Sequence, residues 1–117
     1  MKKLKILWVD DEIEHLKPFI IYLQDKGYAV KTAANGSDAI AMVVEEKFDL
    51  VLLDEMMPGL DGLSTLQEIK KISNSLPVIM VTKNEEEGLM ENAIAGQIAD
   101  YIIKPINPSQ IIIAIKK

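Results

Sequence analysis

The chain has 117 residues, of which 49% are hydrophobic, and this length fits one compact domain with a substantial core. It contains no cysteine, which excludes a disulfide scaffold, a thiolate metal site and a cysteine nucleophile. The net charge is −5 and every basic residue is a lysine, so direct nucleic acid contact by this domain is not expected. The apolar stretch at residues 6–9 is too short for a signal peptide or a membrane span, which favours a soluble, cytoplasmic domain.

Short apolar runs alternate with longer amphipathic segments along the chain, a pattern typical of βα units around a parallel sheet. The run Asp49 to Leu53 is almost continuously apolar, as expected for a strand that is buried on both faces. The predicted elements alternate in chain order, with strands at residues 4–9, 28–32, 49–53, 77–81 and 101–103 and helices at residues 13–26, 38–46, 63–72, 84–95 and 108–115.

Local signals mark the ends of several predicted helices. Pro18 falls inside the first helix and is expected to bend it or to displace one backbone hydrogen bond. Ser37 is predicted to cap the start of the second helix. Asn107 and Pro108 form an N-cap followed by proline at the first helical position, which predicts the start of the last helix.

Polar residues follow four of the predicted strands directly. The acidic run at residues 10–12 follows the first strand, and Asp54 follows the third. Thr82 follows the fourth strand, and Lys104 follows the fifth. The carboxyl ends of parallel strands meet at one edge of a sheet, where ligands bind in open α/β folds. We therefore expect the acids of these strand ends, a hydroxyl and an amine to face one crevice.

The residue types in this crevice favour phosphoryl transfer. Carboxylates about 5 Å apart repel each other by roughly 3 kcal/mol per pair at an effective dielectric constant near 20. Such a cluster attracts a hard divalent cation, and Mg²⁺ prefers oxygen ligands of this kind. Lys104 and Thr82 add a positive charge and a hydroxyl donor for the oxygens of a transferring phosphoryl group. Asp54 ends the most buried strand and is predicted to be the carboxylate that attacks.

The motifs around these residues resemble those of the response regulator receiver (CheY-like) family of two-component systems, and the resemblance spans the whole chain. They are Ile-Leu-Trp-Val-Asp-Asp-Glu at 6–12, Leu-Leu-Asp-Glu-Met-Met-Pro-Gly at 52–59, Val-Thr at 81–82 and Tyr-Ile-Ile-Lys-Pro at 101–105. The resemblance implies a flavodoxin-like (βα)5 doubly wound parallel sheet with strand order 2-1-3-4-5.

The resemblance also implies a role for each site residue. Asp10, Asp11 and Asp54 would bind Mg²⁺ together with the backbone carbonyl of Met56, and Asp54 would become phosphorylated. Lys104 would contact the phosphoryl group, and the Lys104–Pro105 peptide bond would be cis. Thr82 and Tyr101 would form a switch pair.

The partners that the family implies are a sensor histidine kinase or phosphotransfer protein as donor and an effector domain or protein downstream. Phosphorylation would alter the surface formed by the fourth helix, the fifth strand and the fifth helix, and a phosphorylation-dependent homodimer is an open alternative. One helix cannot bury three consecutive isoleucines on one face, so Ile113 is predicted to be exposed on this surface.

The sequence also favours a place for this domain within a longer protein. Residues 1–117 are expected to be the receiver domain at the N-terminus of such a protein. The acidic start of the fourth helix at residues 84–87 and the segment 106–111 resemble regulators whose receiver precedes a PglZ-type, alkaline-phosphatase-like effector.

Three other functions compete with the signalling switch. A haloacid-dehalogenase-type phosphatase carries a second Asp two residues after its nucleophile, and Met56 stands there instead. A nucleotide-binding domain needs a glycine-rich phosphate loop, which the six glycines do not form. A receiver that never takes phosphate is disfavoured because the acidic, Thr and Lys positions are all filled. We therefore expect no enzyme, but a phosphoacceptor with slow intrinsic autophosphorylation and autodephosphorylation.

Overall fold

A parallel β-sheet forms the centre of the computed structural model, which describes residues 3–55, 62–82, 98 and 100–116. Within this part of the chain the sheet has five strands in the order β2-β1-β3-β4-β5, and all neighbouring strands are parallel. The flavodoxin-like strand order 2-1-3-4-5 is therefore confirmed. The strands are β1 (Lys5–Val9), β2 (Ala29–Ala33), β3 (Leu50–Asp54), β4 (Val78–Thr82) and β5 (Asp100–Ile103).

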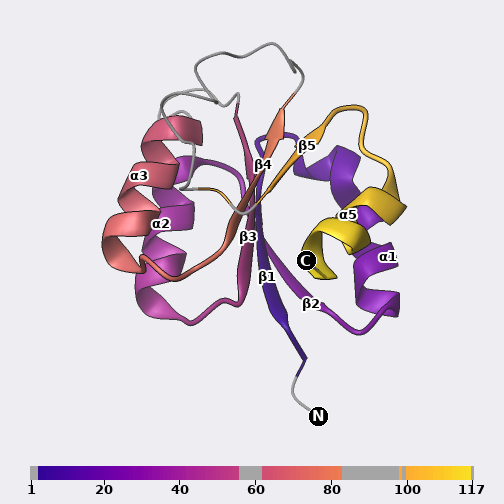
Figure 1. Cartoon of the computed structure of the whole chain (residues 1–117), viewed down its shortest axis with the longest axis horizontal. Helices are drawn as coiled ribbons and strands as arrows, with labels where there is room; N and C mark the ends of the chain where they lie inside the picture. Colours follow the sequence, from indigo (N-terminus) through magenta and orange to yellow (C-terminus); the bar gives the residue numbers. More distant parts are fainter. Residues whose placement is uncertain (1–2, 56–61, 83–97, 99, 117) are drawn as a thin grey trace.

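Helices cover both faces of the sheet, with α1 and α5 on one side and α2 and α3 on the other (Figure 1). The predicted helix at residues 84–95 lies outside the described residues. The described helices are η1, a 3-10 turn (Ile13–Leu16), α1 (Lys17–Asp25), α2 (Gly36–Glu45), α3 (Gly62–Ile72) and α5 (Pro108–Lys116).

The core consists of two apolar layers, one on each face of the sheet. Because successive side chains of a strand point to opposite faces, β3 supplies both layers from its continuous apolar run. Val51 and Leu53 pack with the α2 and α3 side, whereas Leu50 and Leu52 pack with the α1 and α5 side. Every residue of β3 and β4 is buried, which places both strands in the middle of the domain.

Two helix starts follow from asparagine side chains. The Asp38 N–H donates to Asn35 Oδ1 at 2.8 Å, so Asn35 caps α2 and the prediction for Ser37 is wrong. The helix therefore begins two residues earlier than a Ser37 cap would allow, and the Asn35 side chain accepts an N–H of the first turn that has no intrahelical acceptor. The predicted cap of α5 is confirmed, since the Ser109 N–H donates to Asn107 Oδ1 at 3.0 Å and Pro108 is the first helical residue.

The predicted first helix is divided into two parts. Residues 13–16 form the 3-10 turn η1, and α1 begins at Lys17. Pro18 thus lies in the first turn of α1 rather than in a helix interior. The first N–H groups of a helix have no intrahelical acceptor, so the proline displaces no α-helical hydrogen bond, contrary to our expectation.

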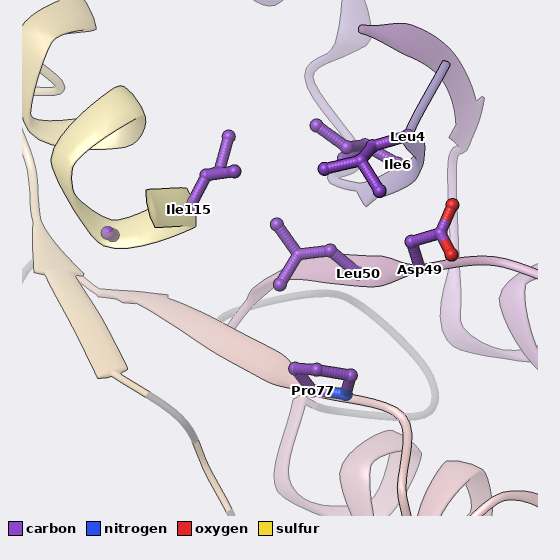
Figure 2. A pocket seen from close by; sticks show the side chains of 7 residues that line it. Leu4, Ile6, Asp49, Leu50, Pro77 and Ile115 are labelled. Carbon is purple, nitrogen blue, oxygen red and sulfur yellow. The ribbon is translucent and has the colours of Figure 1, made fainter. Parts of the chain in front are cut away.

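The amino-terminal ends of the strands surround an apolar cavity of about 290 Å³. Figure 2 shows Leu50 of β3, Ile6 of β1 and Ile115 of α5 around it. Among the described residues that line it, the one carboxylate is Asp49, whose Oδ2 accepts the Lys5 N–H at 2.8 Å beside the start of β1. The polar residues predicted for the site, such as Asp54 and Thr82, lie at the other end of the sheet, where the strands end. In the described part of the chain, none of the helices has the length and hydropathy that a bilayer crossing requires.

Candidate functional site

Asp54 is the last residue of β3 and lies at the centre of the carboxyl edge of the sheet. β3 is flanked by β1 and β4, and Asp54 is aligned with Val81 of β4. The next residue stays attached to the sheet, because the Glu55 N–H donates to the Val81 carbonyl oxygen at 3.0 Å. Asp54 is only 2% exposed, so its carboxylate is buried at the end of an otherwise apolar strand.

The acidic run after β1 forms a compact loop beside it. The Asp10 N–H donates to the Ala33 carbonyl oxygen at 3.0 Å, which fixes the end of β1 against β2. Asp10 Oδ1 accepts the Glu12 N–H at 2.8 Å, a local side-chain bond that turns the chain away from the sheet. One carboxylate oxygen from each of Asp10, Asp11 and Glu12 lies within 4.8 Å of the others. Asp10 is buried, whereas Asp11 and Glu12 are exposed.

Lys104 connects the two buried carboxylates. Its Nζ lies 3.4 Å from Asp54 Oδ1 and 3.7 Å from Asp10 Oδ2, and its side chain is 17% exposed. The Lys104 N–H donates to the Thr82 carbonyl oxygen at 2.7 Å, which holds the end of β5 beside the end of β4. The Lys104–Pro105 peptide bond is cis, as predicted. The ammonium group thus balances negative charge that would otherwise repel within the crevice.

The predicted switch residues lie on the two neighbouring strands. Thr82 is the buried last residue of β4 and is aligned with Ile103 of β5. Tyr101 is aligned with Met80 and is 50% exposed. The predicted metal ligand Met56 lies outside the described residues.

The donor set of the crevice fits a hard divalent cation. Carboxylate oxygens converge from the loop after β1 and from the end of β3, and the Lys104 ammonium lies within 4 Å of Asp10 and Asp54. Oxygen donors of this kind suit Mg²⁺. Sequence reasoning placed Glu12 at the strand end but did not select it as a ligand, although it directly follows Asp11 in the acidic run.

A second hollow adjoins the acidic loop and has a volume of about 340 Å³. Apolar side chains from η1, α1 and the segment after β5 form most of its wall, while polar groups of the crevice form the rest. Glu12 also contacts the exposed His15, whose Nδ1 lies 3.2 Å from Glu12 Oε2. The hollow is lined by Asp10, Glu12, His15, Leu16, Phe19, Lys104, Pro105 and Ile106.

The chain is similar to curated regulatory proteins and to solved receiver structures. It is 38% identical over 112 residues to the transcriptional regulatory protein ResD of Bacillus subtilis, and 38% identical over 105 residues to ZraR of Salmonella typhimurium. These matches cover 96% and 90% of this chain but only 46% and 24% of the relatives, so the chain spans less than half of their length.

Two solved structures show the same fold at similar identity. A receiver domain protein from Methanospirillum hungatei superimposes with a TM-score of 0.90 at 30% identity, over 98% of this chain and 92% of that one. TrrA of Thermotoga maritima, solved in complex with Mg²⁺ and BeF, gives a TM-score of 0.86 at 30% identity, over 97% and 96% of the two chains. The family model of the response regulator receiver domain matches residues 6–116, and the chain belongs to this family of two-component receiver domains.

Proposed function

We propose that Asp54 accepts a phosphoryl group from a sensor histidine kinase or a phosphotransfer protein. The observation that carries this proposal is the buried Asp54 carboxylate with the Lys104 ammonium at 3.4 Å, facing the acidic loop after β1. An Asp54 oxygen attacks phosphorus, the bond between phosphorus and the donor atom breaks, and an acyl phosphate forms. Lys104 then moves from carboxylate to phosphoryl oxygens, and the Thr82 hydroxyl donates to another.

Receiver domains generally bind Mg²⁺ at an acidic cluster, and the carboxylates of this crevice fit that ion. Asp10, Asp11, Asp54 and the Met56 carbonyl would hold it. When bound, Mg²⁺ neutralises negative charge on the phosphoryl oxygens during transfer. Asp10 is prepared for this role by the Glu12 N–H, which already orients one of its oxygens.

The proposed product is a signal rather than a released compound. A turnover enzyme with an aspartyl nucleophile needs a general acid nearby, and Met56 stands where such enzymes carry their second Asp. The acyl phosphate is therefore expected to persist and to be lost by slow autodephosphorylation. Slow autophosphorylation by small phosphodonors follows from the same chemistry.

Phosphorylation is proposed to alter the surface around β5 and α5 through Thr82 and Tyr101. Tyr101 is half exposed and can change its burial when Thr82 is drawn toward the phosphoryl group. The altered surface would control an effector domain, an effector protein or a homodimer partner. ResD and ZraR are named transcriptional regulatory proteins. This domain has a net charge of −5 and lysine as its only strongly basic residue type, so we propose that it makes no direct contact with nucleic acid. We also propose that it acts in the cytoplasm and does not contact the membrane.

The hollow beside the acidic loop gives the phosphodonor a place to dock. Leu16, Phe19 and Ile106 offer apolar contact there, within the same cavity that Asp10 and Lys104 line. A helix of a kinase or phosphotransfer protein seated in this hollow would bring its phosphohistidine to the crevice.

Intact-mass measurement tests the proposed function. The domain is incubated with Mg²⁺ and acetyl phosphate or phosphoramidate, and Asp54→Asn serves as the matched control. We expect one phosphoryl adduct in the wild type, none in Asp54→Asn, and none in the wild type when EDTA replaces Mg²⁺. An adduct in both proteins would move the acceptor elsewhere, and the absence of an adduct with every donor would refute phosphoacceptor function.

A further inference from the structure

Gly62, the buried first residue of α3, contacts the backbone that carries the acceptor. Its N–H donates to the Glu55 carbonyl oxygen at 3.0 Å. Glu55 also bonds to the sheet, because its own N–H donates to the Val81 carbonyl oxygen of β4 at 3.0 Å. Glu55, the residue after Asp54, is thus hydrogen-bonded both to the start of a helix and to a neighbouring strand.

The approach of α3 to the Asp54–Glu55 backbone leaves no room for a side chain at residue 62. A Cβ on Gly62 would lie 2.6 Å from the Asp54 carbonyl oxygen, 2.6 Å from the Glu55 Cα and 2.9 Å from the Glu55 carbonyl oxygen. Ordinary contacts of a Cβ begin at 3.4 Å. All three neighbours are backbone atoms, so no change of side-chain rotamer can relieve the overlap.

Space, rather than backbone conformation, is what requires glycine here. Among the residues that the structure describes, the positive-φ glycine is Gly27, at φ 97°, and Gly62 is not in that region. Alanine has a higher helix propensity than glycine, so an alanine that fitted would stabilise α3. The overlap with Asp54 and Glu55 is therefore the specific effect of a methyl group at residue 62.

A methyl group there must displace either α3 or the end of β3. The helix is anchored in the core by the buried residues Leu66 and Ile69, and the strand end is anchored by the Glu55 bond to β4. Any shift of the strand end moves the Asp54 carboxylate, which lies 3.4 Å from Lys104 Nζ. Displacements of about 1 Å in a reacting group can lower a rate about 100-fold.

We infer that Gly62 is a positioning residue for phosphoryl transfer, because it lets α3 abut the Asp54–Glu55 backbone and so aims the acceptor carboxylate. This inference rests on the proposed function of Asp54. A purely structural role for Gly62 would affect stability alone. The chain supplies a control for that alternative in Gly27, which lies between α1 and β2, and where an added Cβ would meet no other part of the fold within 4 Å.

The test compares Gly62→Ala with Gly27→Ala. Alanine at residue 27 destabilises the fold by backbone strain at the positive φ, without touching the site. For both variants we would measure urea unfolding and the first-order rate of phosphorylation by acetyl phosphate at saturating Mg²⁺, at a temperature where far-UV circular dichroism shows a folded protein. We expect the phosphorylation rate to fall about tenfold or more in Gly62→Ala and less than about twofold in Gly27→Ala.

Each outcome decides between the alternatives. A wild-type rate in folded Gly62→Ala would overturn the positioning role and leave Asp54 as the acceptor, as would equal rate losses in the two variants. If the wild type itself takes no phosphoryl group, the proposed function fails and the role of Gly62 fails with it. Should Gly62→Ala be unfolded in buffer, the rates of all three proteins are measured in a stabilising osmolyte, where a wild-type rate again overturns the inference.

Discussion

Replacing Lys104 by methionine should destabilise the domain in Mg²⁺-free buffer. The wild-type ammonium lies 3.4 Å from Asp54 Oδ1 and 3.7 Å from Asp10 Oδ2, and both carboxylates are almost fully buried. Methionine keeps an apolar stem of similar length but removes the charge. The two carboxylates would then repel each other without a compensating cation.

The magnitude follows from the burial of the three groups. Removing one partner of a buried ion pair typically costs about 3–5 kcal/mol, because the other charge stays buried and unpaired. The Lys104 side chain is 17% exposed, so solvent screens part of the effect and we expect about 2–3 kcal/mol. For a domain of this size the loss corresponds to a fall in Tm of about 10 °C.

Urea unfolding followed by tryptophan fluorescence measures this loss. Trp8 is the single tryptophan and is fully buried, so its emission reports the folded state. Lys71→Met is the matched control, since Lys71 forms an exposed pair with Glu68 and its loss should cost less than about 1 kcal/mol. Saturating Mg²⁺ should recover part of the stability of Lys104→Met. A Lys104→Met protein as stable as Lys71→Met in EDTA would refute the charge balance described here.

Three further changes test other parts of the structure. The Lys5 and Lys31 amines hold the pKa of the Glu46 carboxyl below its ordinary value, so Glu46→Gln should be less stable than wild type at pH values above that ordinary pKa. This difference should vanish as pH falls through the lowered pKa, and a pH-independent difference in urea unfolding would contradict it. Leu52→Ala should lose about 2–5 kcal/mol in urea unfolding, because Leu52 is fully buried. Ile113→Glu should change stability by less than about 0.5 kcal/mol but weaken self-association or effector binding of the phosphorylated form in sedimentation experiments. Unchanged association would remove Ile113 from the proposed contact surface.

Strong periodic signals in the sequence predicted most of the fold. The apolar runs of β3 and β4 could be read as buried strands, and the observed bounds differ from the prediction by one residue. Ile113 is predicted to be exposed because one helix cannot bury three consecutive isoleucines on one face, and it is 59% exposed. These features depend on burial patterns that local sequence carries directly.

Two kinds of feature were harder to predict. One is the choice between neighbouring residues that could fill the same role, and the other is a contact between segments far apart in the sequence. Asn35 and Ser37 can both cap a helix, and only the backbone geometry decides that Asn35 does so. Pro18 looked interior because the 3-10 turn before it has the same apolar spacing as a helix. The need for glycine at residue 62 arises from a backbone contact with Asp54 and Glu55, which no local pattern records. For the site, the strand ends predicted that Asp10, Asp54 and Lys104 lie close together, but not that Lys104 would bridge the two carboxylates.

The acceptor itself can be identified by reductive trapping. Domain phosphorylated with acetyl phosphate is treated with borohydride, which reduces an acyl phosphate to an alcohol, and is then digested and sequenced by tandem mass spectrometry. We expect homoserine in place of Asp54, and unmodified aspartate in domain that was never phosphorylated. Homoserine at another acidic residue, or a phosphoryl adduct that yields no homoserine and maps to His15, would contradict the assignment of Asp54 as the phosphoacceptor.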